Sequence, residues 1–504
     1  MGIRRPLLAL IAALAAGSAT AQAPLSAIDW LSQTPTVALD VAPFVEEPPI
    51  DQGVTTPEVT VSPLGNVGRD AVGLLPSSVT GLPSALWSES PAQTLADRIT
   101  DLRVEGSPAM QALLYTLLLA EANPPQDAGV ADALLVARVD KLMSLGAIEH
   151  ANALLERAGP DTELLFQRWF DVTLLLGEEQ RTCEALNNAS HLAPSYAARV
   201  FCLARTGDWT AAALTLETAN LLGLLTLEED ALLLRFLDPE LAEDAPMLTA
   251  VAEPTPLTFR LYEAIGEPLL AANLPKAYAH ADLRSTAGWK AQLEAAERLA
   301  RVGALPENRL LGIYTDRAPA ASGMIWDRVS ALQSFDKAID AEDTLAVKDT
   351  LPAAWSAVQQ AGIEVPFARL YANQLGTLPL RGVTQVLARE IRLLSPDYEA
   401  ASKQGPQDFL SGIAMGVPPR RGETAQQQAI ADAFHGAGVP QSFTHKLARG
   451  QLGEVILEAM DMYSLGVQGD LRALTNALAT FRSLGLEDTA RQAALQVLLL
   501  DRTQ

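Results

Sequence analysis

The chain of 504 residues contains two cysteines, Cys183 and Cys202. A redox-active pair would need a Cys-x-x-Cys spacing or an adjacent histidine that stabilises a thiolate, and neither is present. The segment between the cysteines predicts two short helices that meet near HLAPS, with Pro194 positioned to start the second. Because both cysteines lie about equally far from this turn, antiparallel helices place them at similar heights. We predict a structural disulfide worth roughly 3 kcal/mol; the alternative is two buried, reduced thiols.

The five histidines give no sign of a metal site: they are His150, His191, His280, His435 and His445. No two of them are four residues apart, and none joins a cysteine or an acidic cluster at the spacing of zinc ligands. The Gly-x-Ser-x-Gly elbow, the P-loop and the dinucleotide-binding glycine pattern are also missing from the sequence. We therefore predict no metal, no cofactor and no enzymatic activity.

One acidic residue needs separate consideration, because Glu89 precedes Ser90. Periplasmic lytic transglycosylases of the superhelical type join a helical solenoid to a domain whose general acid is a glutamate before a serine. Here the pair lies in a proline-rich segment before the predicted helices, and the downstream Gly-Leu-Met-Gln segment of that class is missing. A general acid needs a pocket that raises its pKa, which an extended segment does not supply. We therefore predict no catalytic residue.

The segment 308–328 combines tyrosine, tryptophan and arginine, the residue types that are enriched in binding hot spots. The structural alternative, which we weigh more heavily, is that Trp326 packs inward while Asp327 and Arg328 cap or pair with local groups. The candidate partner-binding residues are Arg309, Tyr314, Arg317, Trp326 and Arg328.

The N-terminal residues have the layout of a secretory signal peptide. Arg4 and Arg5 form a positively charged start, an apolar run follows, and small residues offer a cleavage site after Ala21. The alternative is an uncleaved anchor, although the run is shorter than the roughly 20 residues that span a bilayer. We therefore predict export to the periplasm, with no membrane insertion after the signal peptide is removed.

Composition narrows both the fold class and the kinds of partner. Apolar residues make up 49% of the chain but aromatic residues only 5%, which favours closely packed helices over a sandwich or a barrel. The formal net charge is −23 and the basic residues are scattered, whereas nucleic-acid binding needs clustered lysine and arginine. We therefore predict a protein partner in the cell envelope and no nucleic acid.

Ten prolines between residues 22 and 93 prevent long helices and predict an extended arm. Several apolar residues within this arm are available for docking: Trp30, Leu74, Leu75 and Trp87. We expect them to dock on the first helices of the protein itself, and docking on a partner is the alternative.

After the arm the sequence becomes helical and repetitive. Glycines separate pairs of amphipathic segments, and a small alanine follows five residues after most of them. The glycines are Gly146, Gly177, Gly207 and Gly485, and the alanines are Ala151, Ala212 and Ala490. Glycine permits the backbone of a tight turn, and small residues let paired helices approach. This pattern resembles the tetratricopeptide repeat class over 131–240 and more loosely over 450–500, which implies an all-α, right-handed α-solenoid.

The chain as a whole is similar to a family of exported alphaproteobacterial helical-repeat proteins. The stretches that carry this resemblance are 72–87, the hairpin between the two cysteines with FCLARTGDW, and 274–339. Members are sometimes labelled antifreeze-like, a function that we discount because the sequence contains no regular threonine array for binding ice. The resemblance implies a fold and a location, and no activity.

These observations divide the chain into five parts. They are a signal peptide at 1–21, a proline-rich extended arm at 22–93, a helical-repeat solenoid at 94–400, a loop at 401–428, and C-terminal helical hairpins at 429–504.

The combination predicts a non-catalytic periplasmic scaffold or adaptor that binds a protein partner in the groove of the solenoid. The leading alternative is a peptidoglycan-associated enzyme or regulator of cell-wall metabolism, and a third is a motility accessory protein. A pair of carboxylates in a concave pocket would favour the cell-wall alternative. A groove lined by aromatic and arginine side chains would favour the adaptor.

Overall fold

The structure, a computed structural model, describes residues 68–129, 132–242, 248, 251–319 and 321–500. The predicted signal peptide and Trp30 lie outside these residues. Within them the chain forms helices and no β-strand, apart from one isolated β-bridge between Leu75 and Ala120. The predicted all-α class is confirmed.

The helices follow one another closely along the described residues. The first ten are α1 (Ser77–Thr80), α2 (Ala92–Asp101), α3 (Pro108–Leu119), α4 (Ala133–Ser144), α5 (Ile148–Ala158), α6 (Glu163–Leu176), α7 (Gln180–Asn188), α8 (Tyr196–Arg205), α9 (Trp209–Leu221) and α10 (Leu227–Leu237). The next eight are α11 (Pro256–Ala264), α12 (Ala279–Asp282), α13 (Trp289–Ala300), α14 (Glu307–Thr315), α15 (Ile325–Asp340), α16 (Thr344–Ala361), α17 (Glu364–Thr377) and α18 (Val383–Leu393). The last are α19 (Tyr398–Lys403), α20 (Phe409–Ala414), α21 (Ala425–Phe434), α22 (Gln441–Leu447), α23 (Leu452–Val467), α24 (Leu471–Ser483) and α25 (Glu487–Leu499). Short 3₁₀ turns are η2 (Arg69–Ala71), η3 (Ser190–Leu192), η4 (Pro239–Ala242), η5 (Ala271–Asn273) and η6 (Lys276–Tyr278).

Consecutive helices pack against each other, and the predicted glycines form turns between them. The turns α4–α5, α6–α7, α8–α9 and α24–α25 contain Gly146, Gly177, Gly207 and Gly485, with φ values of 81°, 78°, 93° and 80°. Only glycine adopts this left-handed backbone without a steric penalty. The three alanines that follow at the fifth position are completely buried. The predicted repeat of helical hairpins is confirmed at these positions.

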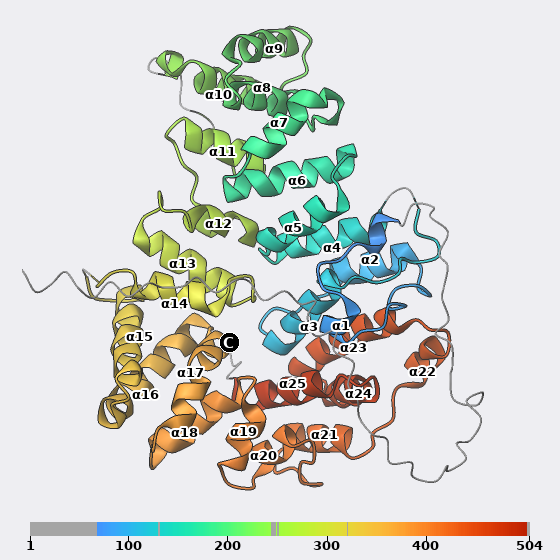
Figure 1. The fold of residues 1–504 in the computed structure, drawn as a ribbon, viewed down its shortest axis with the longest axis vertical. Coiled ribbons are helices and arrows are strands. Elements are labelled where there is room, and N and C mark those ends of the chain that lie inside the picture. Colours follow the sequence, from blue (N-terminus) through green and yellow to red (C-terminus); the bar gives the residue numbers. More distant parts are fainter. Residues whose placement is uncertain (1–67, 130–131, 243–247, 249–250, 320, 501–504) are drawn as a thin grey trace, which may run out of the picture. The chain divides into compact units, whose positions relative to one another are not determined.

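The chain does not continue as a single row of hairpins. Helix α6 packs against α5 and α7, but also against α11 and α12, more than eighty residues further along the chain. After α10 the chain therefore turns back, and the helices from α11 to α13 return past those that precede them (Figure 1). This return places residues from distant parts of the sequence around one space.

The described part of the arm is docked, with its largest side chain in the interior. Trp87 is completely buried against Gly453 of α23, and the Gly453 amide donates a hydrogen bond of 3.0 Å to the Leu86 carbonyl. Leu74 and Leu75 also pack against the core. The arm docks on the first helices as expected, because the Leu74 and Leu75 amides donate hydrogen bonds of 2.8 and 2.9 Å to the Leu119 carbonyl of α3. In addition, Trp87 brings the arm against the C-terminal helix α23.

The segment 401–428, which we predict as a loop, contains the helix α20 and the ends of α19 and α21. Asp408 caps α20 by accepting a hydrogen bond of 2.9 Å from the Ser411 amide, and it forms an ion pair of 2.7 Å with Arg389. A helix of six residues is too short to form by itself. The loop prediction was wrong here. The glycines and prolines of this segment predict irregular structure, but a short helix forms because its cap and tertiary contacts stabilise it.

All the described residues belong to one compact unit that the chain forms after residue 65. None of the helices in this part of the chain combines the length and the hydropathy of a bilayer-spanning segment.

Candidate functional site

The predicted disulfide between Cys183 and Cys202 is present and joins α7 to α8. Glu179, at the start of α7, lies four residues before Cys183, and Arg205, at the end of α8, lies three residues after Cys202. Residues three or four apart share one face of a helix. The disulfide therefore holds an acidic and a basic residue beside each other, one helical turn from the crosslink.

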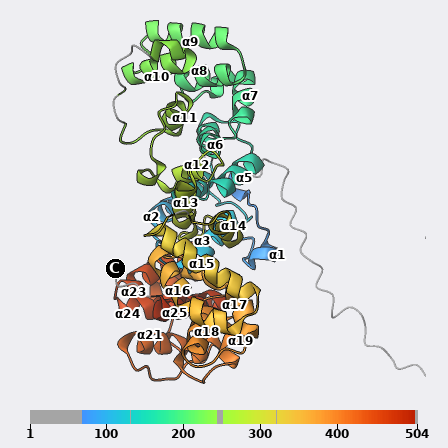
Figure 2. The same ribbon diagram turned by 90° about the vertical axis from the view of Figure 1, so that its left-hand side faces the viewer.

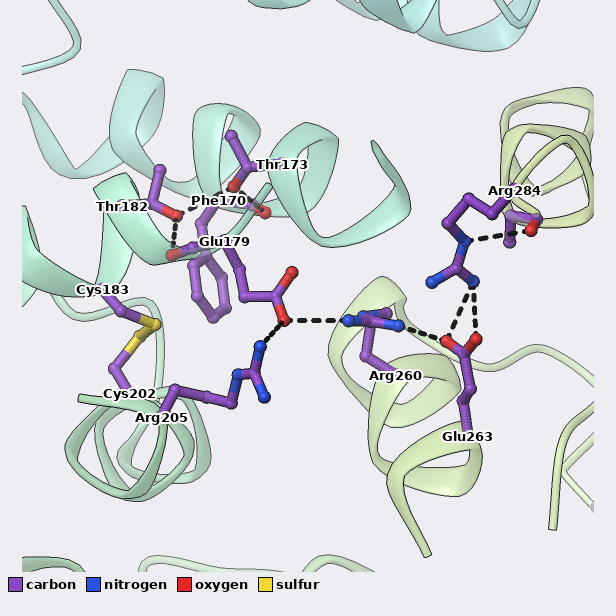
Figure 3. Close-up of polar contacts among 11 residues, drawn as sticks. Phe170, Thr173, Glu179, Thr182, Cys183, Cys202, Arg205, Arg260, Glu263 and Arg284 are labelled. Atoms are coloured by element: carbon purple, nitrogen blue, oxygen red, sulfur yellow. Dashed lines mark hydrogen bonds and ion pairs between the residues drawn. A yellow bond between two sulfur atoms is a disulfide. The ribbon is translucent and has the colours of Figure 1, made fainter. Parts of the chain in front are cut away.

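Three arginines and two glutamates continue from this hairpin to the returning helices (Figure 3). We call the site that they form the arginine pocket; its members are Glu179, Arg205, Arg260, Glu263 and Arg284. Arg205 and Arg260 contact the same oxygen of Glu179, Oε1, at 3.0 and 2.8 Å. Arg260 also pairs with Glu263, one turn further along α11. Glu263 in turn contacts Arg284, which follows α12, at 2.8 Å.

The arginine pocket lines an open cavity of about 520 Å³. Its other lining residues include Phe201, Ala264, Ser285 and Thr286. The charged lining residues have a formal excess of one positive charge, although the whole chain carries −23. Guanidinium groups bind carboxylates and phosphates with paired hydrogen bonds. The cavity therefore has the chemistry of a site for an acidic group.

Two buried polar atoms of the arginine pocket lack hydrogen-bond partners in the structure. Glu179 is only 1% exposed, and both of its arginine partners contact Oε1, so that Oε2 receives no hydrogen bond (Figure 3). The Nε group of Arg260 likewise donates to no acceptor. Buried polar groups are nearly always paired in folded proteins. Both atoms are shielded from solvent, so a ligand in the cavity would contact the exposed parts of the arginines and not these atoms.

The ion pairs favour the charged forms of Glu263 and Arg260. Burial raises the pKa of Glu263, but Arg284 and Arg260 outweigh this effect and lower the pKa below its ordinary value. Burial lowers the pKa of Arg260, but Glu179 and Glu263 outweigh it and raise the pKa. Glu263 is therefore a carboxylate at neutral pH, whereas a general acid must hold a proton.

Two of the predicted partner-binding residues belong to a buried cluster around Glu297 of α13. Tyr314 is 2% exposed, and its hydroxyl donates a hydrogen bond of 2.5 Å to Glu297. Arg328 forms an ion pair of 2.8 Å with the same carboxylate. A buried tyrosine does not present its side chain to a partner, so the prediction for Tyr314 was wrong. Its hydroxyl instead satisfies the buried carboxylate of Glu297.

The other members of that set have local partners. Trp326 is half-buried, and its ring lies 5.2 Å from that of Trp289 between centroids. Asp327 accepts a hydrogen bond of 2.9 Å from the Gly323 amide, as the structural alternative expects. Exposed ion pairs join Arg309 to Glu149 at 2.7 Å and Arg317 to Asp316 at 2.8 Å. Of the predicted set, Arg309 and Arg317 are the residues that remain on the surface.

The residues considered for catalysis and metal binding do not assemble into a centre. Glu89 is exposed and accepts a hydrogen bond of 3.1 Å from Gln126. The ring of the buried His280 contacts the Gly146 carbonyl at 2.6 Å. In the part of the chain that the structure describes, no group of three or more metal-binding side chains could hold an ion.

The arginine pocket was not predicted from the sequence. Its five residues come from α7, α8, α11 and the segment after α12, and only the return of the chain brings them together. The local cues were the closeness of Glu179 and Arg205 to the cysteines and the spacing of Arg260 and Glu263 on one helix. Neither cue indicates that the two pairs meet.

No protein-family model matches the chain, and neither does any curated protein or solved structure.

Proposed function

We propose that this protein is a non-catalytic scaffold or adaptor of the periplasm, and that the arginine pocket binds an acidic segment of a protein partner. The observation that carries the proposal is the collection of three arginines around a cavity in a strongly acidic chain. Arginine recognises carboxylates in a bidentate manner.

The location in the periplasm is supported by the predicted signal peptide and by the disulfide. Disulfides persist in oxidising compartments and are rare in the cytosol. The similarity to an exported helical-repeat family supports the same location and stays a prediction.

The cell-wall alternative would use Glu179 and Glu263 as a catalytic pair. These carboxylates do share one concave site, but both are paired with arginines, and the pKa of Glu263 is lowered. Glycan cleavage needs one carboxyl group with a raised pKa that protonates the leaving group. The ion pairs therefore favour the adaptor over the enzyme.

The proposal is tested with two labelled octapeptides, one rich in aspartate and glutamate and the other with the matching amides. Fluorescence anisotropy should detect binding of the acidic peptide and no binding of the amide peptide. The double variant Arg205→Gln, Arg284→Gln should weaken this binding at least tenfold, or about 1.4 kcal/mol, because it removes two of the three positive charges that line the cavity.

The matched control is Arg157→Gln, Arg181→Gln, which removes two exposed, ion-paired arginines outside the pocket. It should bind the acidic peptide as the wild type does. Equal affinity for the amide peptide would contradict the proposal. Binding of muropeptides with no binding of the acidic peptide would instead favour the cell-wall alternative.

A further inference from the structure

Helices α9 and α10 expose leucines in regularly spaced pairs. Leu214 and Leu221 lie seven residues apart on α9, and Leu227 and Leu234 lie seven residues apart on α10. Residues with this spacing lie on one face of a helix, two turns apart. Leu221 and Leu227 are each 89% exposed. We call the exposed leucines of these two helices and of the turn between them the leucine face: Leu214, Leu221, Leu222, Leu224, Leu227 and Leu234.

The leucine face occurs where the chain turns back. The main packing partners of α9 are α8 and α10, and both views place α9 at the edge of the helices with no helix beyond it (Figure 1, Figure 2). Terminal helices of repeat proteins normally present a polar outer surface. Exposed apolar patches on a folded protein are typical of binding surfaces. Large leucines at this edge therefore indicate that something covers them.

The charges around the leucine face define what can cover it. Residues 206–240 contain seven acidic side chains and a single basic one, Arg235, which is buried. Asp208, Glu217 and Glu228 are exposed next to the leucines. A second copy of the chain would bring acidic residues against acidic residues, and an anionic membrane surface would be repelled in the same way. The complementary partner is apolar in the centre and basic at its edges.

We infer that the leucine face binds an amphipathic helix of a protein partner, with an apolar stripe flanked by lysine and arginine. Recognition of a helix by an apolar surface uses side chains spaced three, four and seven residues apart. The pairs on α9 and α10 have the matching spacing. This inference goes beyond the proposed function, because it does not use the arginine pocket and concerns a ligand of opposite charge.

The test uses a labelled synthetic peptide of eighteen leucines and lysines, arranged so that a helix has one apolar face. A peptide of the same composition but scrambled order, which forms no apolar face, is the control ligand. Anisotropy is measured on the full chain at about 0.15 M salt, where charge attraction alone is strongly screened. We expect the amphipathic peptide to bind at least tenfold more tightly than the scrambled one.

The variant Leu214→Gln, Leu221→Gln should bind the amphipathic peptide at least tenfold more weakly. Because both leucines are exposed, their replacement should leave the fold intact. The matched control, Leu345→Gln, Leu465→Gln, changes two exposed leucines on α16 and α23 and should bind as the wild type does. The arginine-pocket variant Arg205→Gln, Arg284→Gln should also bind the peptide normally, so that failure of the proposed function is separable from failure of this inference.

Equal binding of the scrambled peptide, or unchanged binding by Leu214→Gln, Leu221→Gln, would overturn the inference. Sedimentation velocity decides the second-copy alternative. A wild-type dimer that the leucine variant abolishes would show that the leucine face is covered by another copy, and would also overturn it.

Discussion

Among single residues, Asp171 of α6 has the environment with the clearest consequence for pH dependence. Burial raises the pKa of this carboxyl to about 7, because the opposing effect of Arg168 is smaller and Asp140 adds to the rise. Its ordinary value is 3.8. From about pH 4 to pH 7 the folded protein therefore keeps a proton that the unfolded chain has already lost. The free energy of unfolding falls as the pH rises through this range, and the loss is complete above pH 7.

The variant Asp171→Asn should remove this pH-dependent loss. We expect its free energy of unfolding in urea to equal that of the wild type near pH 4 and to exceed it by about 1–2 kcal/mol at pH 8. This is less than the full shift implies, since the side chain is partly exposed. The control is Asp349→Asn on the exposed side of α16. In this variant the free energy of unfolding should change between pH 4 and pH 8 by as much as it does in the wild type. If Asp171→Asn and the wild type differ in unfolding free energy by the same amount at pH 4 and at pH 8, the raised pKa of Asp171 is contradicted.

At the scale of elements, the disulfide hairpin connects stability to the arginine pocket. Changing both Cys183 and Cys202 to alanine should cost roughly 3 kcal/mol, the loop entropy of a crosslink over about twenty residues. Because Glu179 and Arg205 lie one turn from the sulfurs, the same variant should also bind the acidic peptide more weakly. Urea unfolding and anisotropy measure the two effects. Wild-type protein treated with dithiothreitol should behave like the variant, and unchanged binding in both would separate the pocket from the hairpin.

Individual elements also explain what was predictable from the sequence. The turns at Gly146 and Gly207 and the buried alanines that follow them were predictable, because a left-handed turn and a close helix contact each require a particular residue type nearby. The packing of α6 on α11 and α12 was not, since nothing local specifies contacts between segments so far apart. The arginine pocket depends on those contacts. The same reasoning applies to Tyr314, whose partner Glu297 lies on another helix.

At the scale of the whole described unit, its first helices contact its last ones. Helix α3 packs against α25, and α2 packs against α23. The Ala109 amide donates a hydrogen bond of 2.8 Å to the side chain of Gln496, and Ser464 donates one of 2.8 Å to the Arg103 carbonyl. In an open solenoid each repeat contacts only its neighbours, so that unfolding can begin anywhere. Here the distant contacts couple the first helices to the last.

Trp87 provides a test of this coupling, because it is buried against Gly453 of α23. A Cβ atom at position 453 would lie 2.4 Å from the Trp87 ring, so Gly453→Ala must displace the indole or the helix. Overpacking of this kind costs typically 1–3 kcal/mol. The matched control is Gly312→Ala on α14, where an added Cβ meets no atom within 4 Å and the better helix propensity of alanine should preserve or raise stability.

We expect Gly453→Ala to lower the urea midpoint, and we expect tryptophan fluorescence and circular dichroism to report the same midpoint in the wild type. Coincidence is expected because the tryptophans that the structure describes, Trp87 among them, belong to one compact unit. Two separate transitions would mean that the unit does not unfold cooperatively. A Gly453→Ala variant as stable as Gly312→Ala would mean that the segment around Trp87 is held loosely. The contacts between the ends of the sequence would then contribute little to the stability of the folded unit.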